Sequence, residues 1–247
     1  MITGASRGIG AAIARRLQAK YSLILLARNV DGLEQVAEEA RLAGGAAVSV
    51  ACDLTDWHSV QQAFRKIASH PAPSVLVNNA GIGGPLHRID ETDDAEWSRI
   101  FDSNVRSLFW LCREYLPKMK EQGFGRIVNL SSVLGVVGAA RSSTYVATKH
   151  AMVGYTKALA CEWGAFGITC NAICPGYIDT RMHGASQQAR ISVPLHNVPA
   201  GRLGRPEEIA ALVDFLCSPD AAYINGATIL ADGGLTSGAW TELSTEE

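Results

Sequence analysis

The sequence lacks the features that mark several large classes of protein: long apolar runs, blocks of one charge and paired cysteines. No apolar run approaches the ~18 residues of a membrane-spanning helix, and no signal peptide precedes the first motif. The 22 basic and 24 acidic residues give a formal charge of −2, and no Lys/Arg block marks a nucleic-acid binder. We therefore expect a cytoplasmic protein with neither a membrane nor a nucleic acid as partner.

The six cysteines are scattered along the chain and include no C-x-x-C pair. Cys170 and Cys174 lie on one face of a predicted strand, where metal ligation or a disulfide are two uses open to them. We favour buried, unligated thiols, because free cysteine is among the most buried residue types. This interpretation fits a reducing compartment, and we predict no metal site.

The order of apolar segments predicts the fold. Apolar residues make up 47% of the 247 positions and charged residues 19%, which is enough apolar surface for a large core. Short apolar runs alternate with helical patterns, without a repeat or a linker. This alternation predicts one α/β domain over residues 1–247, a doubly wound parallel sheet (Rossmann fold) with helices on both faces. The predicted strands are 1–3, 22–27, 46–51, 74–77, 126–130, 168–173 and 228–231.

Three further segments carry structural expectations. Residues 94–122 read as one helix with Asn104 in its middle, where asparagine is a poor helix former. Residues 177–205 lack periodicity, and an irregular segment of that length inside a compact domain indicates a lid over a substrate site. The polar tail 236–247 is expected to fray.

A glycine-rich turn follows the first predicted strand. Gly4, Gly8 and Gly10 stand between that strand and a helical pattern, in the spacing Gly-x3-Gly-x-Gly. Glycines let the backbone approach a pyrophosphate, and the helix start offers free N–H groups and a positive dipole end. Any tight strand-to-helix turn also favours glycine, so the loop by itself is weak support for a dinucleotide site.

The end of the second predicted strand bears on which dinucleotide binds. An acid there would bind the ribose 2′-hydroxyl of NAD, but Ala27 and Arg28 occupy that place, and Arg7 lies in the glycine loop. Two cations and no carboxylate suit a 2′-phosphate, which favours NADP(H) over NAD(H). The alternative is that both arginines are merely solvated surface residues.

Tyr145 and Lys149 form a candidate acid/base pair, because residues four apart share one face of a helix. Lowering a tyrosine pKa from ~10 to about 7 requires about 4 kcal/mol. An ammonium about 4 Å away, at an effective dielectric of ~20, supplies on the order of 4 kcal/mol. The pair is therefore sufficient for proton transfer near neutrality, although the same spacing also occurs by chance on solvated helices.

Taken in order, the motifs resemble those of the short-chain dehydrogenase/reductase family, over nearly the whole chain from Thr3 to Gly234. The matching motifs are Thr3-Gly4-x3-Gly8-Ile9-Gly10, Asp53-Leu54, Asn78-Asn79-Ala80-Gly81, Asn104, Ser132, Tyr145-x3-Lys149, Pro175-Gly176 and Asp232-Gly233-Gly234.

Members of this family usually carry several residues before the threonine of the glycine motif. Only Met1 and Ile2 stand there, so we expect the native start to lie upstream.

The resemblance implies hydride transfer between a nicotinamide and a carbonyl or alcohol carbon. Tyr145 would protonate the carbonyl oxygen, and Lys149 would lower the tyrosine pKa and hold the nicotinamide ribose. Ser132, thirteen residues before Tyr145, would hydrogen-bond the same oxygen, and Asn104 would anchor a water that passes protons from Lys149. The implied cofactor contacts are Gly4, Ser6, Arg7, Gly8, Ile9, Gly10, Arg28, Asp53, Leu54, Asn79, Ala80, Gly81, Tyr145, Lys149, Pro175, Gly176, Ile178 and Thr180.

The resemblance also narrows the activity. The Tyr-x3-Lys spacing argues against the family's enoyl reductases, and the segments 199–209 and 221–226 resemble the 3-oxoacyl-(acyl carrier protein) reductases. Arginines typical of carrier-protein reductases are replaced by Gly123 and Phe166, which weakens the carrier-protein interpretation. We expect an NADPH-dependent carbonyl reductase that forms a homotetramer or homodimer. An alcohol, steroid or polyol dehydrogenase and a non-catalytic dinucleotide sensor are the alternatives.

Overall fold

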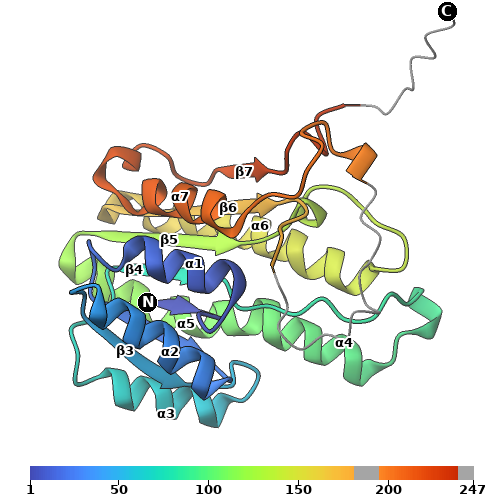
Figure 1. Cartoon of the computed structure of the whole chain (residues 1–247). Coiled ribbons are helices and arrows are strands. Elements are labelled where there is room, and N and C mark those ends of the chain that lie inside the picture. Colours follow the sequence, from blue (N-terminus) through green and yellow to red (C-terminus); the bar gives the residue numbers. More distant parts are fainter. Residues whose placement is uncertain (181–194, 239–247) are drawn as a thin grey trace, which may run out of the picture.

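Seven parallel strands form one sheet in a computed structural model that describes residues 1–180 and 195–238. The order across the sheet is β3-β2-β1-β4-β5-β6-β7 (Figure 1), which confirms the predicted doubly wound fold. Each strand lies within two residues of its predicted limits. The strands are β1 Ile2–Thr3, β2 Leu23–Ala27, β3 Ala47–Ala51, β4 Val75–Asn78, β5 Gly125–Leu130, β6 Ile168–Pro175 and β7 Thr228–Ala231.

Helices cover both faces of the sheet, as predicted. Successive strand residues point to opposite faces, so Leu23 and Leu25 join one apolar cluster while Ile24 and Leu26 join the other. The first cluster packs against α1 (Gly8–Leu17), α2 (Val30–Leu42) and α7 (Pro206–Cys217). The second packs against α3 (Trp57–Ile67), α5 (Ser107–Gln122) and α6 (Ser143–Trp163) on the other side (Figure 1).

The helix predicted over residues 94–122 is not uniform. It consists of α4 (Asp94–Phe101), a π-helical turn over Asp102–Arg106 and then α5. Asn104 lies inside the π turn and is 1% exposed, so the expectation of one regular helix is wrong at this residue. A π turn inserts one extra residue and redirects a side chain inward, a distortion that recurs at functional sites.

The chain reverses direction across the sheet between β1 and β4, which are neighbours although β1 is followed by β2. In open α/β sheets, ligands bind outside the carboxyl ends of the strands at such a switch point. A buried hydrogen bond of 2.8 Å between Asn78 and Asn129 joins β4 to β5, and Asn129 also donates to Thr156 of α6 at 2.9 Å. These amides hold the edge of the sheet on which the site is built.

The structure describes parts of the two segments singled out above. In the predicted lid, residues 181–194 lie outside the described residues, while Ile178 pairs with Gly204 and Ala200 donates to the Gly233 carbonyl. In the predicted frayed tail, residues 239–247 lie outside them as well. Both described ends of the lid segment are thus held beside the carboxyl ends of β6 and β7.

The structure shows the state of the cysteines and bears on membrane spans and metal clusters. All six cysteines are free thiols and five of them are buried, which confirms the interpretation of Cys170 and Cys174 as buried thiols. Within residues 1–180 and 195–238, no helix has both the length and the apolar character needed to cross a membrane. The same residues contain no group of three or more His, Cys, Asp or Glu side chains arranged to hold a metal ion.

One ion cluster predicts how acid affects stability. Asp214 of α7 accepts from Arg16 at 2.9 Å and from Lys20 at 2.7 Å, and its side chain is 6% exposed. Burial alone would raise the pKa of Asp214, but the hydrogen bonds from Lys20 and Arg16 hold it below the usual value. A lowered folded-state pKa gives stability that is present above the unfolded value of ~3.9 and is lost as the pH falls through the folded value.

We therefore expect Asp214→Asn to reduce the free energy of unfolding at pH 7 by about 1 kcal/mol, less than the roughly 1.5–3 kcal/mol of a buried charged hydrogen bond, because both cations are half-exposed. Urea unfolding at pH 7 and pH 3 measures the effect, and the difference from the unmodified protein should shrink at pH 3. A difference that grew on acidification would contradict this assignment.

Candidate active site

Three glycines give the turn between β1 and α1 its shape. Gly4 and Gly8 have φ values of +65° and +56°, a conformation that disfavours side chains. A Cβ on Gly10 would lie 2.3 Å from the Gly4 carbonyl oxygen, and one on Gly4 would lie 3.0 Å from the Ala80 Cα. The glycines are needed because the loop folds back on itself and against the end of β4.

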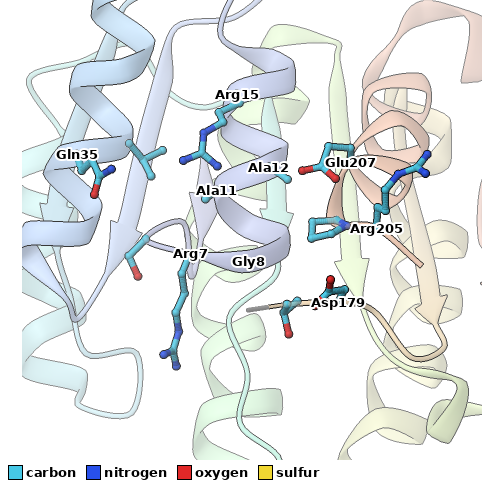
Figure 2. A pocket seen from close by; sticks show the side chains of 13 residues that line it. Arg7, Gly8, Ala11, Ala12, Arg15, Gln35, Asp179, Arg205 and Glu207 are labelled. Atoms are coloured by element: carbon cyan, nitrogen blue, oxygen red, sulfur yellow. The ribbon is translucent and has the colours of Figure 1, made fainter. Parts of the chain in front are cut away.

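The start of α1 is open to an anion. Arg7 occupies the N-cap without a side-chain hydrogen bond, and the first turn contains no acid. The free N–H groups of that turn and the helix dipole both favour a negative ligand. A pocket of about 450 Å³ lies beside this turn (Figure 2), and its lining includes the predicted contacts Ser6, Arg7, Gly8 and Thr180. None of the four predicted catalytic residues lines it, so the reaction centre is assigned from the contacts described below.

Asn79 places the glycine loop. Its Nδ2 donates to the Thr3 carbonyl at 2.8 Å and to the Gly4 carbonyl at 3.3 Å. In return, the Thr3 hydroxyl accepts from the backbone N–H groups of Asn79 and Ala80 at 3.0 and 2.9 Å. Both hydrogen bonds from the Asn79 Nδ2 therefore position the glycine loop, and Asn79 is also one of the predicted cofactor contacts.

The residues predicted for the adenosine side meet beyond β2 and β3. Asp53 Oδ1 accepts from the backbone N–H and the hydroxyl of Thr55 at 2.9 and 2.8 Å, and Leu54 is buried. Burial opposes ionisation of Asp53, but the Thr55 hydrogen bonds and the Arg28 charge together lower its pKa. Arg28 and Arg7 are both exposed, and within the described residues neither forms a salt bridge.

Ser132 and Tyr145 meet at the end of β5. Ser132 follows the strand, and its side chain lies near enough to the Tyr145 phenol to favour the ionised form and so to lower the phenol pKa. Its oxygen also accepts from the Leu134 N–H at 3.1 Å, which places the serine at the start of the short 3₁₀ helix Val133–Gly135. The neighbouring Ser131 is buried and donates to the Lys149 carbonyl at 3.0 Å instead. Of the two serines, the structure therefore brings Ser132 to the tyrosine.

Lys149 lies one turn beyond Tyr145 on α6, and its side chain is buried. Its Nζ donates to the Leu130 carbonyl at 2.8 Å, approaches Met152 Sδ at 3.4 Å and lies 5.5 Å from the centroid of the Tyr145 ring. Burial lowers the pKa of Lys149 to about 8. Burial also raises the pKa of Tyr145, against the opposing hydrogen bond from Ser132. Among these side chains burial therefore outweighs the effect of Ser132, and the lowering of the tyrosine pKa by Lys149 stays a prediction.

Asn104 joins the π turn to the site. Its Oδ1 accepts from the Ile82 N–H at 2.8 Å, and its Nδ2 donates to the Ile82 carbonyl at 2.9 Å and to the Thr148 hydroxyl at 3.1 Å. Thr148 in turn donates to the Tyr145 carbonyl at 2.8 Å. A Cβ on Gly81 would lie 3.1 Å from Asn104 Oδ1 and 3.6 Å from Lys149 Nζ, so all three residues are close together.

The residues predicted for the nicotinamide side follow β6. A Cβ on Gly176 would lie 2.8 Å from the Asp232 Cα, so this glycine allows β6 to pass close to the segment after β7. Asp232 accepts from Gly234 at 3.0 Å and from the Thr236 hydroxyl at 2.6 Å. Pro175 is buried at the end of β6, and Ile178 pairs with Gly204.

Sequence reasoning missed three residues that support the site: Thr148, Met152 and Arg141. Thr148 and Met152 contact Asn104 and Lys149, but an isolated threonine or methionine in a helix carries no signal of such a role. Arg141 has a φ of +60°, the only positive value on a non-glycine residue within the described chain. Its Nε donates to the Leu86 carbonyl at 3.1 Å.

Comparison with known proteins agrees with this geometry. A family model described as "Enoyl-(Acyl carrier protein) reductase" matches residues 4–236. A 3-oxoacyl-[acyl-carrier-protein] reductase of Pseudomonas aeruginosa is 39% identical over 95% of this chain and 96% of its own. The chain belongs to the short-chain dehydrogenase/reductase family. It is therefore an oxidoreductase of that family, as its motifs indicated.

Other relatives show how widely substrates vary within this family. A cis-4-hydroxycyclohexanecarboxylate dehydrogenase of Sinomonas cyclohexanicum is 38% identical over 96% of each chain. The crystal structure of a variant actinorhodin polyketide ketoreductase with NADPH superposes with a TM-score of 0.88, at 33% identity over 96% of each chain. The fold and the family are thus shared by enzymes with different named substrates.

The contact at Gly10 yields a prediction. Gly10→Ala places a methyl group 2.3 Å from the Gly4 carbonyl, which must open the glycine loop. We expect the free energy of unfolding to fall by about 1–3 kcal/mol, as for other overpacked sites, and NADPH affinity to fall at least tenfold. Fluorescence titration and thermal unfolding measure both. Gly138→Ala is the matched control, since a Cβ there meets no atom within 4 Å; equal NADPH affinity in the two variants would refute the prediction.

Proposed function

We propose that this protein is an NADPH-dependent reductase that converts a carbonyl to an alcohol. The observation that carries the proposal is the grouping of Ser132, Tyr145 and the buried Lys149 at the carboxyl end of β5, with Asn104 beside Gly81 and Lys149, at the same edge of the sheet as the glycine loop. Two hydroxyl groups converge there on one place, where a substrate oxygen can accept a hydrogen bond from each.

The proposed mechanism assigns each residue a task. When bound, NADP(H) supplies the hydride that reaches the carbonyl carbon. Tyr145 donates the phenol proton to the carbonyl oxygen, and Ser132 donates a hydrogen bond that stabilises charge on the same oxygen. Lys149 holds the nicotinamide ribose and, at a pKa of about 8, exchanges protons near neutral pH. The side-chain amide of Asn104 is hydrogen-bonded to Ile82 and Thr148, and it fixes the π turn past which a water would reach Lys149.

NADP(H) is proposed over NAD(H) because of the charges beside the glycine loop. Arg7 extends past the loop (Figure 2), and Arg28 follows β2, where no carboxylate stands to bind a 2′-hydroxyl. Both guanidinium groups are free of salt bridges in the described chain and so remain open to a phosphate. The ketoreductase structure with NADPH supports the same choice.

The substrate class rests on the relatives. The 3-oxoacyl reductase similarity makes 3-oxoacyl thioesters the first class to test, and alcohol, steroid or polyol substrates are the alternatives within the family. A non-catalytic dinucleotide sensor is disfavoured, since Asn104, Ser132, Tyr145 and Lys149 are all present and converge. We also propose that residues 1–247 form one domain, with the segment 177–205 as a lid.

We further propose a homotetramer, because large apolar side chains are exposed on two different pairs of elements. Trp97 and Phe109 are exposed on α4 and α5, and Phe215 and Leu230 are exposed on α7 and β7. A closed tetramer with twofold symmetry uses at least two different self-complementary surfaces, whereas a dimer needs one. Free, mostly buried thiols support a reducing compartment, and we propose the cytoplasm.

Removal of the proton donor tests the reaction. Tyr145→Phe should lower kcat by about a thousandfold, within the usual contribution of a general acid, while NADPH affinity stays within about threefold. NADPH oxidation with a 3-oxoacyl thioester or a simple ketone measures the first quantity, and fluorescence titration the second. Tyr155→Phe, ten residues further along α6, is the control and should keep full activity. Full activity of Tyr145→Phe would end the proposal.

Charge removal tests the cofactor. Arg7→Ala and Arg28→Ala should each raise KM for NADPH at least tenfold, the effect of losing one charged hydrogen bond of about 1.5–3 kcal/mol, and leave KM for NADH unchanged. Arg15→Ala is the control: Arg15 lines the same pocket but is paired with Glu39 at 2.7 Å. A tenfold preference of the unmodified enzyme for NADH would overturn the assignment.

A further inference from the structure

The two ends of the catalytic edge of the sheet differ in charge. At the cofactor end, neither Arg7 nor Arg28 forms a salt bridge among the described residues, although Asp53 lies close enough for the Arg28 charge to lower its pKa. At the reaction end, the loop 82–93 after β4 and the loop 133–142 after β5 contain one arginine each. Arg88 is paired with Asp90 at 3.1 Å, and Arg141 with Glu91 at 3.4 Å. Among the described residues, Arg7 and Arg28 at the cofactor end are thus free of salt bridges, whereas Arg88 and Arg141 in the two loops at the reaction end are each paired with a carboxylate.

In the described segment 82–96 at the reaction end, carboxylates outnumber cations. Segment 82–96 carries five acids and a single arginine, and its His87 contacts Glu96 at 3.1 Å. Asp93 and Asp94 stabilise the N-terminus of α4, but Asp90 and Glu91 precede that helix. Across the site, Arg202 and Arg205 both contact Glu208. The acids of this rim are Asp90, Glu91, Asp93, Asp94 and Glu96.

Exposed apolar side chains are concentrated in the same loops. Leu86 and Ile89 are 54% and 66% exposed in the loop after β4, and Val136 and Val137 are exposed in the loop after β5. Tyr177 and Leu195 are exposed in the segment after β6. Single exposed apolar residues are ordinary, but six from the three loops that surround one reaction centre indicate a surface that an apolar ligand covers.

Arg141 holds the first two loops together. Its Nε bonds the Leu86 carbonyl at 3.1 Å, while the adjacent Ser142 pairs with His87. The residue adopts a left-handed φ of +60°, a strained conformation that persists only where surrounding contacts impose it. Arg141 therefore links the two loops of the rim, four residues before Tyr145, and the charge of Glu91 partly offsets its own.

We infer that the substrate is an uncharged, apolar carbonyl compound that enters free in solution, and that polyanionic carriers such as coenzyme A or an acidic carrier protein are disfavoured. This inference rests on the proposed function. Its basis is the two loops 82–93 and 133–142; Arg181 and Arg190 belong to the segment outside the described residues. An apolar wall with an acidic rim attracts neutral ligands by contact and repels phosphate groups over about a Debye length.

The test compares one acyl group on two thiols. The 3-oxobutanoyl thioester of N-acetylcysteamine is neutral, whereas the coenzyme A thioester carries phosphates. We measure kcat/KM for both, at ~20 mM and ~500 mM ionic strength, in the unmodified enzyme and in Asp90→Lys/Asp94→Lys. Both residues are exposed, and neither is placed in the catalytic site. Glu121→Lys/Asp220→Lys makes the same charge change on two exposed residues, Glu121 in the last turn of α5 and Asp220 just after α7, at the ends of these helices that lie opposite the site.

At low salt, the rim variant Asp90→Lys/Asp94→Lys should raise kcat/KM for the coenzyme A thioester at least threefold. It should change kcat/KM for the neutral thioester less than twofold, because only the charged substrate is repelled by the carboxylates of the rim. High salt should remove the gain, and the control variant should show none. Asp90→Asn/Asp94→Asn should give an intermediate gain.

Equal ratios of the two thioesters in all variants would overturn the inference, as would a higher kcat/KM for the coenzyme A thioester that falls in the rim variant. Failure of the proposed function is distinguishable. It would appear as no NADPH oxidation with either thioester or with neutral ketones, in every variant.

Discussion

The hydrogen bonds from Asn79 to the carbonyl groups of Thr3 and Gly4 are the constraint on which the rest of the site depends. They join the turn after β1 to the end of β4, the two strands between which the chain reverses direction. Because Gly10 then packs against Gly4, the start of α1 points its free N–H groups over this junction. The anion site and the switch point are therefore products of one contact between segments 75 residues apart.

A second set of buried polar contacts extends from that junction to the reaction centre. Asn78 bonds Asn129 across the strands, Asn129 bonds Thr156 of α6, and Asn104 bonds Thr148 of the same helix. Each amide is buried, so an unpaired partner would cost about 1–3 kcal/mol. This penalty holds α6 in one position relative to β4 and β5, and α6 carries both Tyr145 and Lys149. Precision at the reaction centre thus derives from amides that touch no substrate.

Much of the fold was predictable from local patterns. Strand limits followed from apolar runs, because parallel strands are buried on both faces and need no other signal. The absence of disulfides among the six cysteines likewise followed from their scattered spacing, and five of these free thiols are buried. The π turn at Asn104 was not predictable, since its stability depends on hydrogen bonds to Ile82 and Thr148 that are 22 and 44 residues away. The left-handed conformation at residue 141 was not predictable either, because that position is an arginine and not the glycine or asparagine that usually marks a positive φ.

The sequence by itself determined the order of strands and helices and the glycine turn, and it identified the residues proposed for the chemistry: a tyrosine as acid/base, a lysine, a serine and two arginines for a phosphate. Those features are encoded by local spacing and residue type. The tertiary structure alone decided how these groups act. It selected Ser132 over Ser131 and moved the Lys149 ammonium 5.5 Å from the Tyr145 ring centroid. Burial, which no local pattern measures, then raised the tyrosine pKa and lowered that of the lysine.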